Sequence, residues 1–337
     1  MLSKFDVYNK DIKEGFLKYY SKNKDTLTSL IYTFQRGEPL ERQLDKDLSQ
    51  MNIFEVNQMA KSIDSISEQM IRTILSVYSS YTDWCMQNVK DLDIDVNSYR
   101  IFLSQKTDLK EYVSLVKAKN MYITEEDVDI IVSRLVNAQD KAYILALYEG
   151  VRGTAMSELR NMKIDDIDEE TNEIKLYDDN GTDRIITISE KLKNILNKAN
   201  EQKRYLLNNG VKSEGMLSTV RSLRPSEYVF KSKAGDSTEE SEDTRVSSQN
   251  TSTLIQQIRR YMENVLDVGE NYSFITPRSI YDSGMINLAI DAYDRGEINN
   301  LDVGELRVVL KDYQLSHTQL YNARDKIQFC LDKKYLE

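Results

Sequence analysis

The sequence has little of the chemistry that metal-dependent and thiol-dependent proteins use. It contains two cysteines, Cys85 and Cys330, and one histidine, His317. Two cysteines so far apart in the chain exclude a disulfide framework and a CxxC metal site. A single histidine argues against zinc clusters and Ser-His-Asp hydrolysis. We therefore expect no metal and no organic cofactor.

Long apolar runs are also missing. The longest, Ala142–Tyr148, is far shorter than the roughly 18 residues that a membrane-spanning helix requires. The first fifteen residues, MLSKFDVYNKDIKEG, lack the apolar segment of a secretory signal. These features predict a soluble, cytoplasmic protein that does not contact a membrane.

Proline and glycine are scarce, with 3 and 12 in 337 residues, and this composition favours long helices. A chain of this length predicts two domains. Polar breaks divide it into a helical domain over residues 1–92, a helical linker region over 93–120 and a second domain over 121–337. The Ser-, Thr- and acid-rich stretch 232–253 predicts a mobile acidic loop inside the second domain.

The second domain has clear local signals for helices and for one hairpin. Thr124 with Asp127, and Ser316 with Gln319, predict capping boxes, while Thr276-Pro277 predicts another helix start. Asn180-Gly181, between two short β-favouring runs, predicts a hairpin. Further predicted elements are a buried helix at 142–148, a strand at 228–230 and a helix at 254–266. The fold class is mostly α with a small β-hairpin.

The net charge of −10 argues at first against a nucleic-acid partner. However, the segments Asp165–Asp183 and Asp236–Asp243 together carry −13, so the rest of the chain carries +3. A basic face is therefore still compatible with the composition.

Three stretches of the second domain resemble the motifs of tyrosine recombinases, the phage integrase family. LALYEGVRGTAMSELRNMKIDDID resembles the first arginine box, with three extra residues between the arginine and S-E-L. IKLYDDNGTDRIITIS resembles the hairpin that carries a lysine, and FITPRSIYDSGM resembles the box in which I-T-P precedes H-x-x-R. The resemblance spans about Met121 to Glu337. It implies a catalytic-type domain preceded by a helical domain like the core-binding domain of that family.

The resemblance also implies six active-site positions, and this chain keeps two of them. Arg152 matches the first arginine and Tyr321 matches the nucleophile. The other four positions differ: Asp179 replaces the lysine, Arg278 the histidine, Tyr281 the second arginine and Asp312 the remaining histidine. His317 is out of register for a catalytic role.

These replacements predict a very poor recombinase. The family's arginines neutralise the phosphoryl transition state, and its lysine helps to protonate the leaving oxygen. Asp179 and Asp312 would instead direct negative charge at a scissile phosphate. Arg152 and Arg278 still allow static phosphate binding. The pattern also resembles the recombinase-like repressors of SPβ-type Bacillus prophages.

Other basic residues are weaker candidates for DNA contact. Arg259 and Arg260 lie largely off the apolar stripe of their helix, which suits either a solvated face or insertion into the major groove. The remaining candidates, which as surface charges commonly do nothing specific, are Arg221, Arg224, Arg72 and Lys61. Arg152 and Tyr321 also have ordinary alternatives, as a structural ion pair and as core packing.

Three functions remain open from the sequence. The first is a sequence-specific binder of double-stranded DNA that has lost strand cleavage and acts as a phage or prophage transcriptional repressor. The second is an active but divergent recombinase that uses Tyr321. The third is a protein-interaction module that has abandoned DNA. Self-association through the amphipathic C-terminal helix, or docking of that helix on its own domain, fits the spacing, and a regulatory protein or peptide is a further partner to consider.

Overall fold

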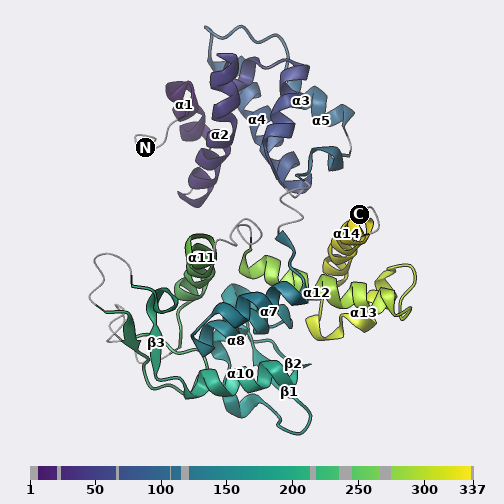
Figure 1. Cartoon of the computed structure of the whole chain (residues 1–337). Helices are drawn as coiled ribbons and strands as arrows, with labels where there is room; N and C mark the ends of the chain where they lie inside the picture. Colours follow the sequence, from purple (N-terminus) through teal and green to yellow (C-terminus); the bar gives the residue numbers. More distant parts are fainter. Residues whose placement is uncertain are drawn as a thin grey trace. The chain divides into compact units, whose positions relative to one another are not determined.

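The computed structural model describes residues 7–20, 24–65, 68–106, 108–114, 121–212, 218–234, 245–265 and 275–334. The chain divides into two units, Met1–Lys119 and Asn120–Glu337, each with its own apolar core. Figure 1 shows both units. Among the described residues, no helix has both the length and the apolarity needed to cross a membrane.

The named elements in the described part of the N-terminal unit are all helices (Figure 1). Its helices are α1 (Lys10–Tyr20), α2 (Lys24–Leu44), η1 (Leu48–Gln50), α3 (Ile53–Ser62), α4 (Glu68–Asn88), α5 (Ser98–Gln105) and η2 (Lys110–Tyr112). Edge-to-face aromatic pairs fill the core, and Phe34 contacts Phe16 and Tyr81.

Much of the stretch predicted as a linker, residues 93–120, packs into this unit. Tyr99 and Phe102 of α5 are buried in its core, and so are Leu109 and Tyr112. Tyr99 packs edge-to-face on Tyr78 of α4. The described residues up to Ser114 therefore belong structurally to the N-terminal unit, although their polar composition is typical of a connection.

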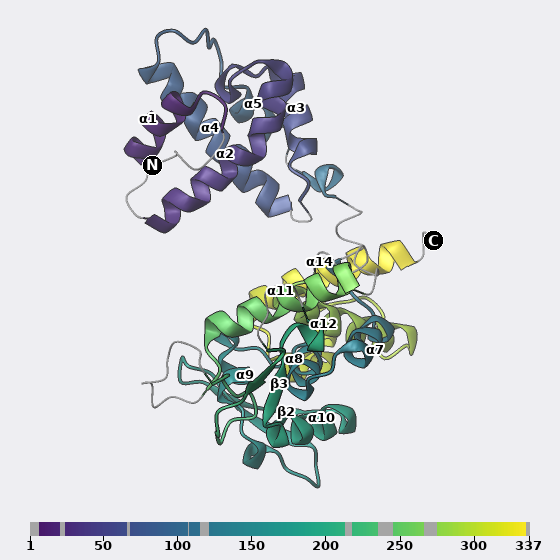
Figure 2. The same cartoon turned by 60° about the vertical axis from the view of Figure 1, so that its left-hand side comes forward.

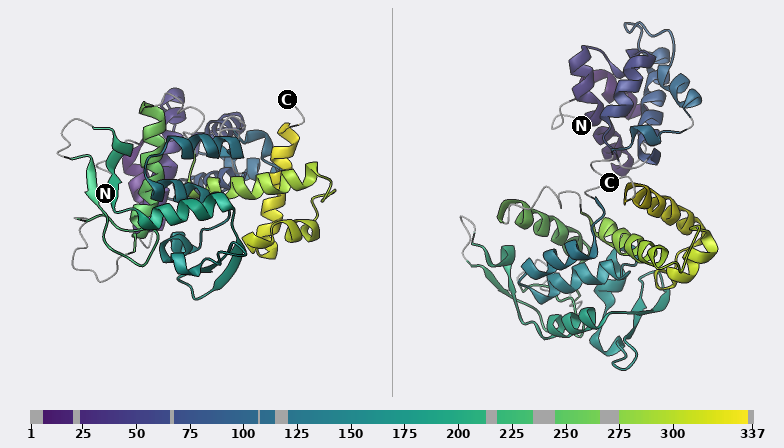
Figure 3. Two further views of the ribbon diagram at one scale, coloured as in Figure 1. Left: turned by 60° about the horizontal axis from the view of Figure 1, so that its bottom comes forward. Right: turned by 45° about the vertical axis from the view of Figure 1, so that its right-hand side comes forward.

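Helix α8 (Ala138–Tyr148) is the centre of the C-terminal unit, and α7, α10 and α12 pack around it (Figures 2 and 3). Eight of its eleven residues are apolar, so it can be buried on several sides. The remaining helices of the unit are α7 (Glu125–Arg134), η3 (Thr154–Met156), α9 (Ser157–Asn161), η4 (Ile164–Asp166), α10 (Glu190–Glu201), η5 (Leu207–Gly210), α11 (Ser248–Val265), α12 (Pro277–Asp294), α13 (Val303–Val309), η7 (Lys311–Tyr313) and α14 (His317–Lys334).

Two small antiparallel sheets complete the described part of this unit. Strands β1 (Glu173–Tyr177) and β2 (Asp183–Thr187) form the hairpin predicted at Asn180-Gly181, with Ile174 opposite Ile186 and Gly181 at a φ of +83°. Strands β3 (Arg204–Leu206) and β4 (Val220–Ser222) form the other sheet. The prediction of a strand at 228–230 is wrong, because Tyr228 forms only an isolated β-bridge with Lys163.

The helix signals that depend on local capping are confirmed. Thr124 with Asp127 begins α7, and Thr276 with Pro277 begins α12. Ser316 and Gln319 exchange hydrogen bonds at the start of α14. The predicted loop 232–253 is corrected at its end, because α11 begins at Ser248. Residues 235–244 of that loop lie outside the described part of the chain.

The C-terminal helix α14 packs on its own unit. Leu320, Ala323 and Ile327 are buried, and α14 contacts α12 and α13. Its outer face carries Tyr321, whose side chain is 42% exposed.

Asp140, in the first turn of α8, is a buried carboxylate that accepts hydrogen bonds from the Tyr205 hydroxyl at 2.8 Å and from Asn137 at 2.9 Å. Burial raises its pKa to about 6, above the value of an exposed aspartate. The folded state therefore holds this proton when the unfolded state has lost it. The free energy of unfolding should fall by about 3 kcal/mol as the pH rises from about 4 to above 6.

We expect Asp140→Asn to remove this pH dependence, measured as the difference between variant and wild-type urea-unfolding curves from about pH 4 to 7.5. The exposed Asp325 supplies a matched control, since Asp325→Asn should follow the wild-type curve. An Asp140→Asn variant whose stability runs parallel to the wild type across this range would contradict the prediction.

Candidate phosphate-binding site

Arg152 lies in a tight loop between α8 and α9, residues 149–156, which is called the arginine loop below. Gly150 and Gly153 have φ values of +96° and +67°, and a Cβ at Gly153 would lie 2.5 Å from Ser157 Oγ. The three extra residues noted in the sequence form η3, in which Ala155 and Met156 also adopt positive φ. Non-glycine residues in this region cost roughly 1 to 2 kcal/mol each. Surrounding contacts must therefore hold the loop.

An ion pair between Arg184 and Glu158 holds one side of the loop. Arg184 Nε lies 2.6 Å from Glu158 Oε1, and Glu158 Oε2 accepts a hydrogen bond from the Arg152 backbone N–H at 2.7 Å. Arg184 also donates to the carbonyls of Gly150 and Asp312. Burial opposes the charge of Arg184, but the hydrogen bonds that it donates to the Glu158 carboxylate raise its pKa above the usual value. One guanidinium thus joins β2, α9, the arginine loop and η7.

The hairpin holds the other side of the loop. Asp178 accepts hydrogen bonds from the Thr154 backbone N–H at 2.9 Å and from the Ser157 hydroxyl at 2.8 Å. The next residue, Asp179, which the motif alignment placed at the lysine position, pairs with Arg160 and accepts a hydrogen bond from Asn161 at 3.0 Å. The hydrogen bond from Asn161 and the pair with Arg160 lower the pKa of Asp179. This position therefore holds an ionised acid, engaged in structure, instead of a proton donor.

Two guanidinium groups converge on the ring of Tyr281. The Cζ atoms of Arg152 and Arg278 lie 5.6 Å and 5.8 Å from its centroid, within the range of cation–π contacts. Tyr281 is buried, and its hydroxyl approaches the carbonyl of Tyr313 at 3.5 Å. The ring of Tyr281 therefore supports two neighbouring cations.

Arg152 is the less neutralised of these two cations. Its Nε is buried and has no hydrogen-bond partner among the described residues. Burial and the nearby charge of Arg278 lower its pKa. By contrast, Arg278 Nε lies 3.0 Å from Asp282 Oδ1, and Asp282 is shared with Lys326 of α14. An anion bound beside Arg152 would compensate the buried charge of this guanidinium. It would also reduce the repulsion between Arg152 and Arg278.

The predicted nucleophile lies on an exposed surface of α14. The Tyr321 ring packs edge-to-face on His317 at a centroid distance of 5.0 Å, and Arg324 Cζ lies 5.2 Å from it. The structure thus brings together Arg152, Arg278 and Tyr281 of the predicted site, with Arg184 and the Asp312 carbonyl beside them. The described contacts of Tyr321 are with α14 itself.

The remaining basic candidates are distributed over other elements. Helix α11 packs against η3, next to the arginine loop, and carries the half-buried Arg259 and the exposed Arg260. Arg221 is exposed on β4, and Arg224 is half-buried after it. In the N-terminal unit, Arg72 pairs with Glu68 at 3.1 Å and Lys61 is exposed at the end of α3. These positions stay predictions as DNA contacts.

Comparison with known proteins matches both units to one family. Residues 122–335 match the family described as "MrpR, C-terminal catalytic domain", and residues 7–87 match "MrpR, N-terminal core-binding domain". The chain belongs to the MrpR family. This confirms the expected recombinase fold, with a helical core-binding domain followed by a catalytic-type domain.

This chain is also similar to individual proteins. The SPbeta prophage-derived uncharacterized protein YopR of Bacillus subtilis (strain 168) is 26% identical over 336 residues, covering 95% of this chain and 94% of the relative. Among solved structures, XerA recombinase is 13% identical with a TM-score of 0.40, covering 97% of each chain. The Tn1549 transposon integrase (aa 82-397), in complex with circular intermediate DNA, is 12% identical with a TM-score of 0.44, covering 93% of each chain.

The candidate site contains residues that were assigned no functional role from the sequence. Glu158 and Arg184 were visible only as parts of motifs, and nothing in their spacing shows that they pair across 26 positions. Asp178 and Lys326 also belong to the supporting contacts. An acid in the S-E-L segment and an arginine in the hairpin were the available signals.

Proposed function

We propose that this protein binds double-stranded DNA through a phosphate at Arg152 and Arg278, does not cleave the strand, and acts as a transcriptional repressor of a phage or prophage. The observation that carries the proposal is the pair of guanidinium groups on Tyr281, with the buried Nε of Arg152 left without a described hydrogen-bond partner. Guanidinium groups form strong, charge-assisted hydrogen bonds with phosphate.

The absence of efficient cleavage follows from the groups at the other positions. Asp179 is an ionised acid bound to Arg160, and Tyr281 is a neutral phenol where related enzymes have an arginine. Loss of one transition-state donor costs on the order of 100- to 1000-fold in rate. A protein that occupies DNA without cutting it can regulate transcription by occupancy, and the prophage-derived relative supports this setting.

DNA binding can be tested by capture of genomic fragments on the purified protein, followed by mobility shift on the enriched sequence. We expect the affinity for the enriched fragment to exceed that for a scrambled fragment and to fall steeply with salt, because phosphate contacts release counterions. A transcriptional fusion to the same fragment should be repressed by the wild-type protein. An affinity for DNA that does not change between about 50 and 200 mM salt would contradict phosphate binding. If the purified protein also captures proteins and not DNA, the interaction-module alternative is favoured.

The exposure of Tyr321 next to His317 and Arg324 is the observation that favours an active recombinase instead. We expect no covalent adduct between the protein and a nicked suicide substrate built on the bound sequence. Tyr321→Phe should bind this DNA within about twofold of the wild type, since only one hydroxyl is lost. A denaturation-resistant adduct that forms with the wild type and disappears in Tyr321→Phe would establish cleavage and overturn the proposal.

A further inference from the structure

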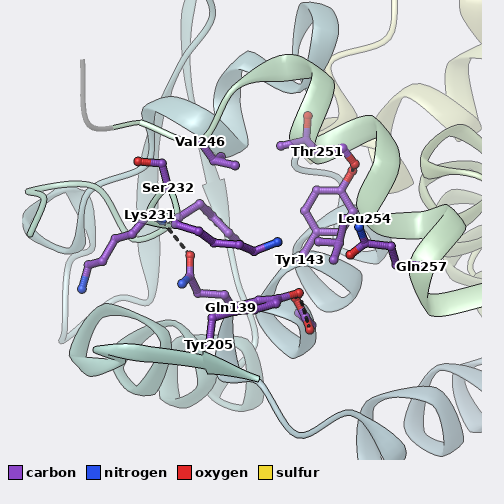
Figure 4. Close-up of a pocket in the computed structure, with 12 residues that line it drawn as sticks. Gln139, Tyr143, Tyr205, Lys231, Ser232, Val246, Thr251, Leu254 and Gln257 are labelled. Carbon is purple, nitrogen blue, oxygen red and sulfur yellow. Dashed lines mark hydrogen bonds between the residues drawn. The ribbon is translucent and has the colours of Figure 1, made fainter. Parts of the chain in front are cut away.

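A cavity of about 190 Å³ lies in the C-terminal unit (Figure 4). Neither Arg152 nor Arg278 lines it. Its walls come from the start of α8, from β3, from residues 230–233 and Val246, and from α11. An engineered cavity of about 150 Å³ is large enough to bind benzene. The cavity can therefore hold a small aromatic molecule.

Three aromatic side chains give the cavity flat apolar walls. Tyr143 and Phe230 pack edge-to-face with a centroid distance of 6.3 Å, and Tyr205 lies on β3. The hydroxyls of the two tyrosines are already engaged, because Tyr143 donates to the Thr251 carbonyl at 2.9 Å and Tyr205 donates to Asp140. The rings thus offer faces and edges for packing, not hydrogen-bond donors.

Gln139 supplies the polar group that lacks a partner. The residue is only 5% exposed, and its Oε1 accepts a hydrogen bond from the Lys231 backbone N–H at 2.6 Å (Figure 4). This bond fixes the orientation of the amide. The Nε2 atom on the other side has no hydrogen-bond partner among the described residues. A buried amide donor without a hydrogen-bond partner destabilises the empty protein, and an acceptor atom of a ligand would satisfy it.

The charged residues Lys233 and Asp140 line the cavity. The Asp140 carboxylate already accepts hydrogen bonds from Tyr205 and Asn137, so the charge left for a ligand favours an acceptor over a cation. The Lys233 ammonium lies 4.3 Å from the Tyr205 ring centroid and lowers the pKa of the nearby Asp140. Gln139 also occupies the first turn of α8, where the helix dipole attracts partial negative charge. By contrast, the Lys231 ammonium bonds the Asn200 carbonyl, and in Figure 4 its side chain runs away from Tyr143 and Leu254.

We propose that this cavity binds a small planar aromatic molecule that presents a carbonyl or carboxylate oxygen to Gln139 Nε2. Thr251, Leu254 and Gln257 of α11 line the same cavity, and α11 carries Arg259 and Arg260. The ligand would therefore shift DNA affinity through α11, a second step that rests on the proposed DNA-binding function.

Benzamide, benzoate and benzylamine are suitable probes, titrated against the full chain without DNA by ligand-observed NMR. We expect saturable binding of benzamide or benzoate at millimolar concentration or below, and none of benzylamine. Gln139→Glu keeps the acceptor for Lys231 N–H but removes the donors, so it should weaken both acceptor probes at least roughly tenfold and admit benzylamine.

Lys233→Met and Lys203→Met are a matched pair, because each removes one positive charge and Lys203 is exposed and does not line the cavity. We expect Lys233→Met to weaken benzoate severalfold and Lys203→Met to leave it within about twofold of the wild type. Lys233→Met also keeps the test decisive if Gln139→Glu fails to fold. Absence of saturable binding to the wild type, or binding that neither Gln139→Glu nor Lys233→Met alters, would overturn the site.

The coupling to DNA is measured separately, by mobility shift with and without a saturating probe. We expect a change in DNA affinity of about threefold or more. Probe binding without such a change, in a protein that binds DNA, would overturn the coupling and support the site alone. A protein that binds the probe but no DNA would refute the proposed function while supporting the ligand site.

Discussion

Arg152→Ala is expected to weaken DNA binding about 10- to 100-fold, the effect of losing a charge-assisted hydrogen bond to phosphate. The plot of log affinity against log salt should become shallower by about 0.9, the contribution of one phosphate. The variant should not lose stability. Burial and repulsion by Arg278 disfavour the charge in the free protein, and the Arg184–Glu158 pair that holds the loop does not include the Arg152 side chain.

Arg295→Ala is a matched control for the loss of one positive charge. Arg295 follows α12 and pairs with Glu297 at 2.6 Å on the surface. Its replacement changes the net charge by the same amount, and we expect DNA affinity to change by less than about twofold. A structural role for Arg152 would give a different result: Arg152→Ala would then lower the unfolding temperature and leave the salt dependence unchanged.

Local signals predicted a large part of this fold because their causes lie within a few residues. The capping boxes at Thr124 and Ser316 and the Asn180-Gly181 turn each depend on contacts about three or fewer positions apart. The start of α11 was missed for the converse reason. Its first turn, SQNTST, is polar, and it is helical because Thr251 and Ile255 pack into the core of the C-terminal unit.

The candidate site was predictable as a set of positions but not as a geometry. Aligned motifs placed Arg152, Arg278 and Tyr281 in one region, and the structure does bring their side chains together. The sequence alone led us to expect Asp179 to repel a phosphate. In the structure its carboxylate is paired with Arg160, a contact between α9 and the residues after β1 that no spacing rule reports.

Gly284→Ala should have the largest effect on stability. Gly284 is buried in α12 where this helix crosses the end of α8, and a Cβ there would lie 1.7 Å from the Tyr148 carbonyl oxygen and 2.8 Å from the Tyr313 hydroxyl. These two atoms are themselves hydrogen-bonded at 2.8 Å. Because backbone lies in the path, α8 and α12 must separate, and we expect a loss of about 3 kcal/mol or more.

The loss of stability in Gly284→Ala should appear in the C-terminal unit only. Scanning calorimetry of Gly284→Ala should show the C-terminal unit melting roughly 6 to 12 °C lower, with the N-terminal unit unchanged because its core is separate. Gly304→Ala adds the same methyl group at an exposed position in α13, where the nearest atom is a carboxylate oxygen of Asp302, and should be nearly neutral. Since the end of α8 leads into the arginine loop, Gly284→Ala should also weaken DNA binding at temperatures where the fold persists. Equal melting of Gly284→Ala and Gly304→Ala would show that the two helices do not meet at this glycine.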